Sequence, residues 1–428
     1  MRSTASLDPG PRRRTRRGAS ALLLSLSLVI ATPAAGAEPA NADDPNVISA
    51  WNAIAASIIP ANPAAFLNYA FVHLAMYNAV NGITNEYDLY RWNAVGPENA
   101  SAEAAAAVAA HRVLMTYFGT TPTVADALNE HLADSLAAVP DGGRKDRGVR
   151  YGLRAADRII ALRAGDGRGA VVTIPQPTGA GDWRPTSPNT AFAVPWLGLV
   201  KPLALDSLTR FDPGAPPAIG SRRYRLELAE VRAVGAAGAT GGARTLDQEL
   251  TARYFADIPF GPMQAGLRGV AERRSMDISE SARLFAATNT SIADAIGTAW
   301  HAKLEYMWWR PITAIREDHD DGDSRTVADP AWTSLIAAPP YSEWPSGLCS
   351  VTGALTASLQ RVVGRVHLTV ESPSQGQRTW TSKAALDRAC VDARVWSGIH
   401  FRTSDVAAIK IGTASAGYIM DRYFAPAD

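Results

Sequence analysis

Three short blocks in the last third of the chain carry the residues that are best suited to chemistry. They contribute three cations, one hydroxyl with a neighbouring amide, and one imidazole: Lys303, Arg310, Arg394, Ser346, Gly347 and His400. Fixed positive charges beside hydroxyl and amide donors are the groups that hold a tetrahedral oxyanion of high charge. The blocks therefore predict a pocket for phosphate or vanadate.

The spacing of the first block places both of its cations at one pocket. Lys303 and Arg310 are seven residues apart, which on a helix leaves them about 20° apart around the axis and about 10 Å apart along it. Pro311 disfavours helical geometry at the residue before it. We therefore expect the Arg310 guanidinium at the last helical position, pointing off the helix end.

The other two blocks have local signals of their own. Ser346 and Gly347 precede an apolar run, 351–359, that is typical of a helix. Free N–H groups and the positive end of a helix dipole should then lie beside the Ser346 hydroxyl. Gly398 stands between Arg394 and His400 and can end a helix. His400 would then fold back to the side on which Arg394 lies.

These residues resemble the pattern shared by the vanadium-dependent haloperoxidases and the type 2 phosphatidic acid phosphatases. In that pattern Lys and Arg-Pro are followed by Pro-Ser-Gly-His, and then by Arg and a last His. The chain matches it at eight positions, namely Lys303, Arg310, Pro311, Pro345, Ser346, Gly347, Arg394 and His400. It departs at Leu348, where the pattern has another histidine, and its later acid, Asp405, comes one position late.

Segments outside the pocket resemble the bacterial, secreted haloperoxidase-like branch. They are 71–80, 183–185, 200–202, 216–217 and 401–402. The resemblance covers most of the mature chain and implies an all-α helical bundle with a long irregular segment rich in Pro, Gly and Trp. It also makes Trp300 and Tyr341 candidates for an aromatic halide pocket.

The resemblance implies a role for each pocket residue. His400 would bond vanadium axially, while Lys303, Arg310 and Arg394 would neutralise the equatorial oxygens. Ser346 and the Gly347 amide would donate hydrogen bonds. Vanadate in such a site is a Lewis acid that polarises hydrogen peroxide for attack by halide, giving hypohalous acid, which then reacts with an organic acceptor. In the phosphatase branch the same imidazole attacks phosphorus.

Leu348 bears on both activities. The histidine that it replaces is the acid–base group in either branch, and such groups contribute about 100- to 10,000-fold to rate. Leucine cannot move a proton, although Glu343 and Tyr341 are proton carriers nearby in the sequence. Three functions follow: an impaired haloperoxidase-like enzyme, an acid phosphatase with His400 as nucleophile, and a catalytically degenerate phosphate or vanadate binder.

The N-terminal residues predict export. A cluster of arginines at 12–17 precedes an apolar run, 19–31, and a small-residue site at 35–37. This is the form of a cleaved signal peptide, 1–37, with a mature chain that starts at Glu38. The Arg16 and Arg17 pair fits either the twin-arginine or the general secretory route.

Composition limits the classes of partner that the protein is expected to bind. The 42 Lys and Arg balance 41 Asp and Glu, a net charge of +1, which does not favour nucleic acid binding. No stretch of the mature chain is long and apolar enough to span a membrane.

The two cysteines, Cys349 and Cys390, favour a disulfide between the oxyanion loop and the Arg394 helix in an exported protein. Two buried free thiols are the alternative.

The mature chain divides into three parts by pattern. Apolar spacing predicts a helical part over 38–164, an irregular covering segment over 165–244, and a second helical part over 245–428 that carries the pocket. Within these parts we expect a mobile stretch at 235–244 and Ser404 as the N-cap of the last helix.

Several polar residues favour structural interpretations. His73 and His111 lie on apolar helical faces and are expected to be core histidines. His301 should point away from Lys303. The acidic run 317–323 has the wrong order for a calcium loop and is expected to be a solvated turn. A hydrolase triad of Ser346, His400 and Asp405 would leave three basic residues without a role.

Overall fold

The computed structural model describes residues 46–176, 178–317 and 326–427. In this part of the chain the regular elements are helices and one two-stranded hairpin, which confirms the all-α prediction. The signal peptide, the start at Glu38 and most of the acidic run 317–323 lie outside the described residues. None of the helices described here is both long and apolar enough to cross a membrane.

Five helices make up the N-terminal part: α1 Val47–Ile58, α2 Ala65–Thr84, α3 Ala102–Phe118, α4 Pro122–Ala137 and α5 Gly143–Leu162. The side chains of Asn46, Ser101 and Thr121 cap α1, α3 and α4, as expected for short polar residues before a helix. Helix α2 is buried along almost its whole length. It packs against α3, α5 and the long helix α9, so it joins this part to the rest of the core.

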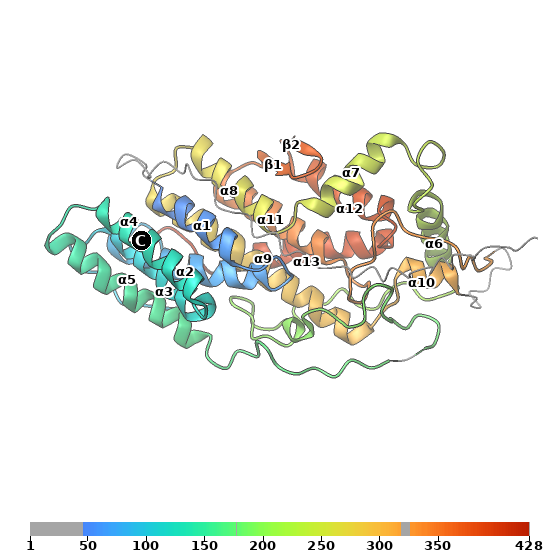
Figure 1. The fold of residues 1–428 in the computed structure, drawn as a ribbon, viewed down its shortest axis with the longest axis horizontal. Coiled ribbons are helices and arrows are strands. Elements are labelled where there is room, and N and C mark those ends of the chain that lie inside the picture. The colour runs from blue at the N-terminus through green and yellow to red at the C-terminus, as the bar shows by residue number, and fades with distance from the viewer. Residues whose placement is uncertain (1–45, 177, 318–325, 428) are drawn as a thin grey trace, which may run out of the picture. The chain divides into compact units, whose positions relative to one another are not determined.

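The C-terminal part is built around α9. Its helices are α6 Arg222–Val234, α7 Leu246–Asp257, α8 Gly261–Arg273, α9 Ile278–Tyr306, α10 Pro311–Arg316, α11 Gly347–Val363, α12 Lys383–Trp396 and α13 Arg402–Met420. Helix α9 begins at a capping box formed by Asp277 and Glu280. It packs against α2, α11 and α13 (Figure 1). Helix α9 therefore carries Lys303 through the middle of the core.

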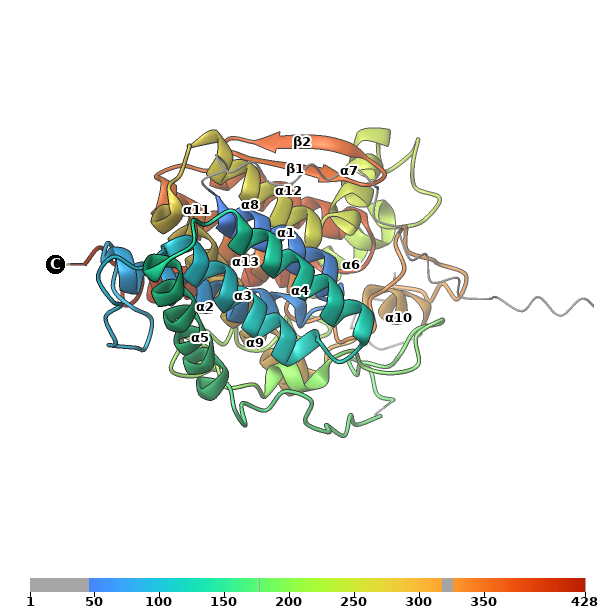
Figure 2. The ribbon, with the colours of Figure 1, turned by 60° about the vertical axis from the view of Figure 1, so that its left-hand side comes forward.

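The hairpin was not predicted from the sequence. Strands β1 Leu368–Ser372 and β2 Gly376–Trp380 pair antiparallel, with Leu368 opposite Trp380. Figure 2 shows them near α8 and α12, with which they are in contact. Leu368, Val370 and Ser372 are buried and alternate with less buried residues, a period of two that indicates a strand.

The irregular segment is ordered by buried polar contacts. It contains a 3₁₀ turn, η1 Pro195–Gly198, and the Asp294 carboxylate of α9 accepts bonds of 2.7–2.8 Å from the backbone N–H groups of Leu203, Ala204 and Leu205. The predicted irregular range 165–244 is interrupted by a helix, α6, over 222–234. Ser221 caps α6 by accepting from the Tyr224 N–H, and that cap was overlooked.

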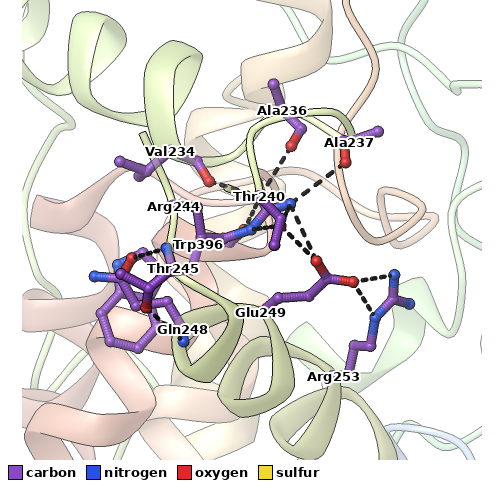
Figure 3. A network of polar contacts seen from close by, with 10 residues as sticks. All are labelled: Val234, Ala236, Ala237, Thr240, Arg244, Thr245, Gln248, Glu249, Arg253 and Trp396. Carbon is purple, nitrogen blue, oxygen red and sulfur yellow. Dashed lines mark hydrogen bonds and ion pairs between the residues drawn. The ribbon is translucent and has the colours of Figure 1, made fainter. Parts of the chain in front are cut away.

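Residues 235–244 were expected to be mobile. In the structure the Arg244 side chain holds them through hydrogen bonds to backbone carbonyl oxygens. This side chain is fully buried, and Nη1 donates to the carbonyl oxygens of Val234, Ala236 and Trp396 at 2.7, 2.9 and 3.2 Å. Figure 3 shows the guanidinium surrounded by these groups and by Thr240. Since Trp396 is the last residue of α12, Arg244 ties the loop after α6 to the end of the helix that bears Arg394.

Replacing this arginine should be costly. In Arg244→Met several buried carbonyls lose their donor, and we expect the free energy of unfolding to fall by about 3 kcal/mol. Denaturant unfolding measures the change. Arg253→Met is the matched control, because both Arg244 and Arg253 contact Glu249, but the Arg253 side chain is 41% exposed. The Arg253–Glu249 ion pair should therefore contribute less than about 1 kcal/mol. Equal losses in the two variants would contradict this account.

Candidate active site

Lys303 and Arg310 lie near each other as predicted, but the backbone between them differs from the prediction. Helix α9 ends at Tyr306 because Met307 adopts a left-handed conformation with φ of 40°, so Arg310 is not its last residue. Arg310 is instead the N-cap residue of α10, with Pro311 at the first helical position. The Lys303 Nζ and Arg310 Cζ atoms still lie 5.1 and 5.0 Å from the centre of the Tyr341 ring.

The second block begins a helix at the residue predicted to donate its amide. Helix α11 starts at Gly347, with Ser346 in the N-cap position but without a capping bond from its hydroxyl. The Ser346 Oγ atom is therefore left available. A Cβ atom on Gly347 would lie 2.8 Å from Cζ3 of Trp300, so only glycine allows α9 and the start of α11 to approach so closely.

The third block turns as predicted. Helix α12 ends at Trp396, and Gly398 has φ of 77°, which reverses the chain between Arg394 and His400. Gly398 also meets Gly235, since a Cβ on Gly398 would lie 2.4 Å from the Gly235 carbonyl oxygen. Ser404 is not the predicted N-cap, because α13 already begins at Arg402.

The hydrogen bonds of His400 define its tautomer. Its Nε2 atom lies 3.2 Å from Arg310 Nη1, and because a guanidinium can only donate, Nε2 must accept. The proton is then on Nδ1, which donates to Glu343 Oε1 at 2.8 Å. Burial, followed by Arg310 and the other two cations, holds the pKa of His400 well below its usual value. The imidazole is thus neutral, with a lone pair on Nε2.

Glu343 is the site residue whose role the sequence did not reveal. Beyond His400, its Oε1 accepts from the Phe401 N–H at 3.0 Å, and burial raises its pKa to about 7. Asp405, the acid that comes one position late, does not contact His400. Its Oδ1 atom accepts from Cys349 Sγ at 3.4 Å, and burial raises its pKa well above the usual value. A search for an acid before Ser346, rather than after His400, would have found the partner.

Several buried donors of the pocket have no partner. Within the described residues no acceptor meets Arg310 Nη2 or Arg394 Nε. The Ser346 hydroxyl also has no partner at good hydrogen-bonding geometry among these residues, but a longer hydrogen bond from it lowers the pKa of Asp405. Lys303 Nζ donates to the Ser342 and Glu343 carbonyl oxygens at 2.7 and 3.0 Å, which leaves one of its three protons.

Such a set fits a tetrahedral oxyanion. Buried donors without acceptors are costly, and an anion would satisfy them. No ion pair joins Lys303, Arg310 or Arg394 to a carboxylate in the part of the chain that the structure describes. Their positive charge is therefore available to vanadate or phosphate. No group of three His, Cys, Asp or Glu side chains that could hold a metal cation occurs among the described residues.

The candidate aromatic residues and Leu348 lie at the edge of the pocket. The Trp300 and Tyr341 ring centres are 4.7 Å apart, and Lys303 Nζ is 5.6 Å from the Trp300 ring. Leu348 is half-buried and packs against the hydrophobic core. It lines a cavity together with Trp300, Tyr341 and Arg394. The position of the absent histidine therefore faces apolar surroundings.

Cys349 and Cys390 lie side by side as the sequence predicted, but they are not bonded. Both are buried free thiols, with their sulfurs 2.9 Å apart. Burial raises the pKa of Cys349 well above its usual value. The disulfide stays a prediction.

The three other histidines named above do not enter the pocket. His73 is fully buried beside Asn52, with a Nε2 to Nδ2 distance of 2.9 Å, and burial lowers its pKa to about 3. His111 contacts Asn129, and His301 Nδ1 lies 3.0 Å from the Gly198 carbonyl oxygen. His73 is thus a core histidine as predicted, whereas His111 is only partly buried.

Comparison with known proteins places the pocket in a recognised fold. Residues 283–427 match the family model of the VCPO second helical-bundle domain. A segment of 95 residues is 33% identical to vanadium chloroperoxidase of Curvularia inaequalis, and it spans 21% of this chain but 16% of that protein. The family match therefore falls on the part of the chain that contains Lys303, Ser346 and His400.

Two bacterial crystal structures resemble nearly the whole fold. The first bacterial vanadium-dependent iodoperoxidase superposes with a TM-score of 0.75 at 22% identity, covering 90% of this chain and 98% of that one. A holo-type bacterial vanadium-dependent chloroperoxidase gives 0.64 at 18% identity, covering 85% and 93%. These findings confirm the resemblance drawn from the sequence, and at such identities the structures establish the fold.

Oxyanion affinity should depend on pH through Lys303. Burial, Arg310 and Arg394 hold the pKa of this ammonium well below its usual value, so the amine loses its proton as pH rises. A bound anion favours the protonated form. We expect the affinity for sulfate, whose charge is constant from mildly acidic to mildly alkaline pH, to fall by up to about tenfold per pH unit above the lowered pKa.

Calorimetric titration with sulfate across that pH range measures this slope. Lys303→Arg keeps the positive charge and should flatten it, since a guanidinium stays protonated. A pH-independent affinity in the native protein, or the same slope in Lys303→Arg, would show that another group titrates.

Proposed function

We propose that this chain, which has the fold of the bacterial vanadium haloperoxidases, binds vanadate and oxidises halide with hydrogen peroxide, slowly. The observation that supports the proposal is the group of buried, unpartnered donors on Arg310, Ser346 and Arg394 beside the unprotonated Nε2 of His400. Vanadate would supply Lewis acidity toward peroxide. The cofactor, the halide and the turnover are all parts of the proposal.

The chain's own residues would hold the cofactor. His400 Nε2 would be the ligand atom, because Nδ1 is engaged by Glu343. That carboxylate fixes the ring orientation and raises the basicity of Nε2. Arg310 Nη1 donates to Nε2 in this structure, and the Arg310 guanidinium, whose Nη2 has no partner among the described residues, would donate to the oxygens of a bound anion. Lys303 and Arg394 supply the remaining positive charge, and Ser346 and the Gly347 amide supply neutral donors.

Slow turnover follows from Leu348. Glu343 does not replace the missing histidine, because its carboxylate contacts Nδ1, whereas Nε2 is the nitrogen that lies beside Arg310. Trp300 and Tyr341 present aromatic rings to Lys303. Leu348 itself has no proton to donate, and we expect rates about 100- to 10,000-fold below those of an enzyme with an acid–base histidine.

A phosphatase is the second candidate. The Glu343–His400 pair, with Nε2 unprotonated, also suits a nucleophilic imidazole that attacks phosphorus once Arg310 Nη1 has turned away from Nε2. Leu348 would then leave the departing alcohol without a proton donor, so esters with good leaving groups, such as phenyl phosphates, would react best. A protein that binds oxyanions and shows neither activity would be the degenerate binder.

We also propose that the protein is exported by cleavage after residue 37 and that Cys349 and Cys390 become a disulfide in an oxidising compartment. The adjacent sulfurs support this pairing. Thiol labelling of the unfolded, exported protein should detect no free cysteine before reduction and both after it. Two free thiols in exported material would contradict the disulfide.

The activity test uses position 348. Native protein, Leu348→His and His400→Ala are assayed for peroxide-dependent bromide oxidation with and without vanadate, and for phenyl phosphate hydrolysis. We expect weak, vanadate-dependent oxidation in the native protein, an increase of about 100-fold or more in Leu348→His, and none in His400→Ala. Ester hydrolysis that vanadate inhibits, without bromide oxidation, would favour the phosphatase. Sulfate binding with neither activity in any variant would favour the binder.

A further inference from the structure

A cavity of about 390 Å³ adjoins the candidate active site. It shares Gly347, Leu348 and Arg394 with the pocket, and its volume is in the range that accommodates small organic molecules. A larger cavity of about 730 Å³ elsewhere, near Arg402, contains none of the pocket residues. Of these two, the smaller cavity can place an organic molecule next to a bound oxyanion.

The lining of this cavity is apolar and aromatic. Its largest side chains are Phe66, Phe255, Phe260, Trp300 and Tyr341. Among the described residues of the lining there is no carboxylate, and the Arg394 guanidinium is the charged group. Aromatic walls with few polar groups favour a neutral molecule that contains a ring. An oxyanion in the pocket would neutralise Arg394 and leave the cavity without net positive charge.

Leu348 makes the apolar surface continuous up to the pocket. Leu348 follows Gly347 in the first turn of α11, is half-buried, and packs against the hydrophobic core. A histidine at this position would place a polar and titratable ring on the wall. The leucine that weakens proton transfer therefore improves the cavity as a binding site for an apolar ring.

Phe260 shows that the aromatic wall is held in place. Its φ is 68°, a conformation that non-glycine residues with large side chains rarely adopt. Its ring lies 5.2 Å from that of Phe66. Such backbone strain persists where surrounding contacts enforce it and is concentrated at ligand sites. The Phe66–Phe260 pair is thus a fixed part of the cavity wall.

We propose that this cavity binds the organic acceptor of the oxidised halogen, a neutral molecule with one or two aromatic rings. The inference rests on the proposed function. The acceptor's ring carbon forms a bond to the halogen of hypohalous acid, and the ring proton leaves with the oxygen as water. Overall, arene, halide, hydrogen peroxide and one proton give the halogenated arene and two waters. Binding beside the oxyanion places the ring where hypohalous acid forms.

The experiment measures binding of 1-naphthol by calorimetry, with and without sulfate. Ile336, a half-buried residue of the lining, is replaced in Ile336→Trp to fill the cavity. Ile174→Trp is the matched control, because Ile174 is also half-buried in an irregular segment but does not line the cavity. We expect saturable binding to the native protein and the control, and an affinity lower by about tenfold or more in Ile336→Trp.

A second measurement tests the acceptor role. Bromination of 1-naphthol by the native protein, whose cavity wall keeps Leu348, should give a ratio of ring isomers that differs from the ratio produced by free hypobromous acid, and Ile336→Trp should restore the free ratio. Sulfate affinity and thermal unfolding confirm that each variant is folded with its pocket intact.

The outcomes separate the two proposals. Absence of saturable binding, or equal affinity in the two tryptophan variants, would overturn the cavity assignment. Binding with an isomer ratio equal to that of free hypobromous acid would overturn the acceptor role. If bromide oxidation is absent from all variants, the proposed function fails and the acceptor role fails with it, while the affinities still decide whether the cavity takes aromatic rings.

Discussion

The structure depends on keeping three like charges buried around one neutral imidazole. Lys303, Arg310 and Arg394 are 0–6% exposed, and each of them lowers the pKa of His400. Burial of unpaired charge is among the costliest arrangements that a fold can hold. The surrounding helices must therefore position these residues firmly enough that repulsion does not drive them apart.

Backbone carbonyl oxygens, rather than carboxylates, provide this restraint. Lys303 donates to the carbonyls of Ser342 and Glu343, and Arg310 donates to those of Tyr341 and Ile399. A carbonyl accepts a hydrogen bond without cancelling the cation's charge, so the positive potential of the pocket is retained. Arg244 is held by carbonyls in the same way near the end of α12. The segment 341–343 is thus as important to the site as the side chains it supports.

Sequence spacing predicted the fold class and brought the right residues to one pocket, because helix periods, proline and glycine are local signals. Gly398 ended its helix as expected, and Lys303 and Arg310 met although α9 stopped early at Met307. The pairing of His400 with Glu343 was not predicted because it joins residues 57 positions apart, and no local pattern links residues so distant in the sequence. The hairpin and α6 were not predicted. Both are short, and both lie close to glycine and proline residues, which are typical of turns and loops.

The contact between Gly235 and Gly398 shows that the pocket is not a self-contained module. The turn that presents His400 is in backbone contact with a loop that lies before residue 283, where the recognised domain begins. Arg244, from the same loop, holds the last carbonyl of α12. A fragment cut at the domain boundary would keep every oxyanion ligand in its sequence and lose the packing that orients two of them. The unit that orients these residues is therefore larger than the matched domain, and exchanging the pocket between related proteins would require transfer of the loop 235–244 as well.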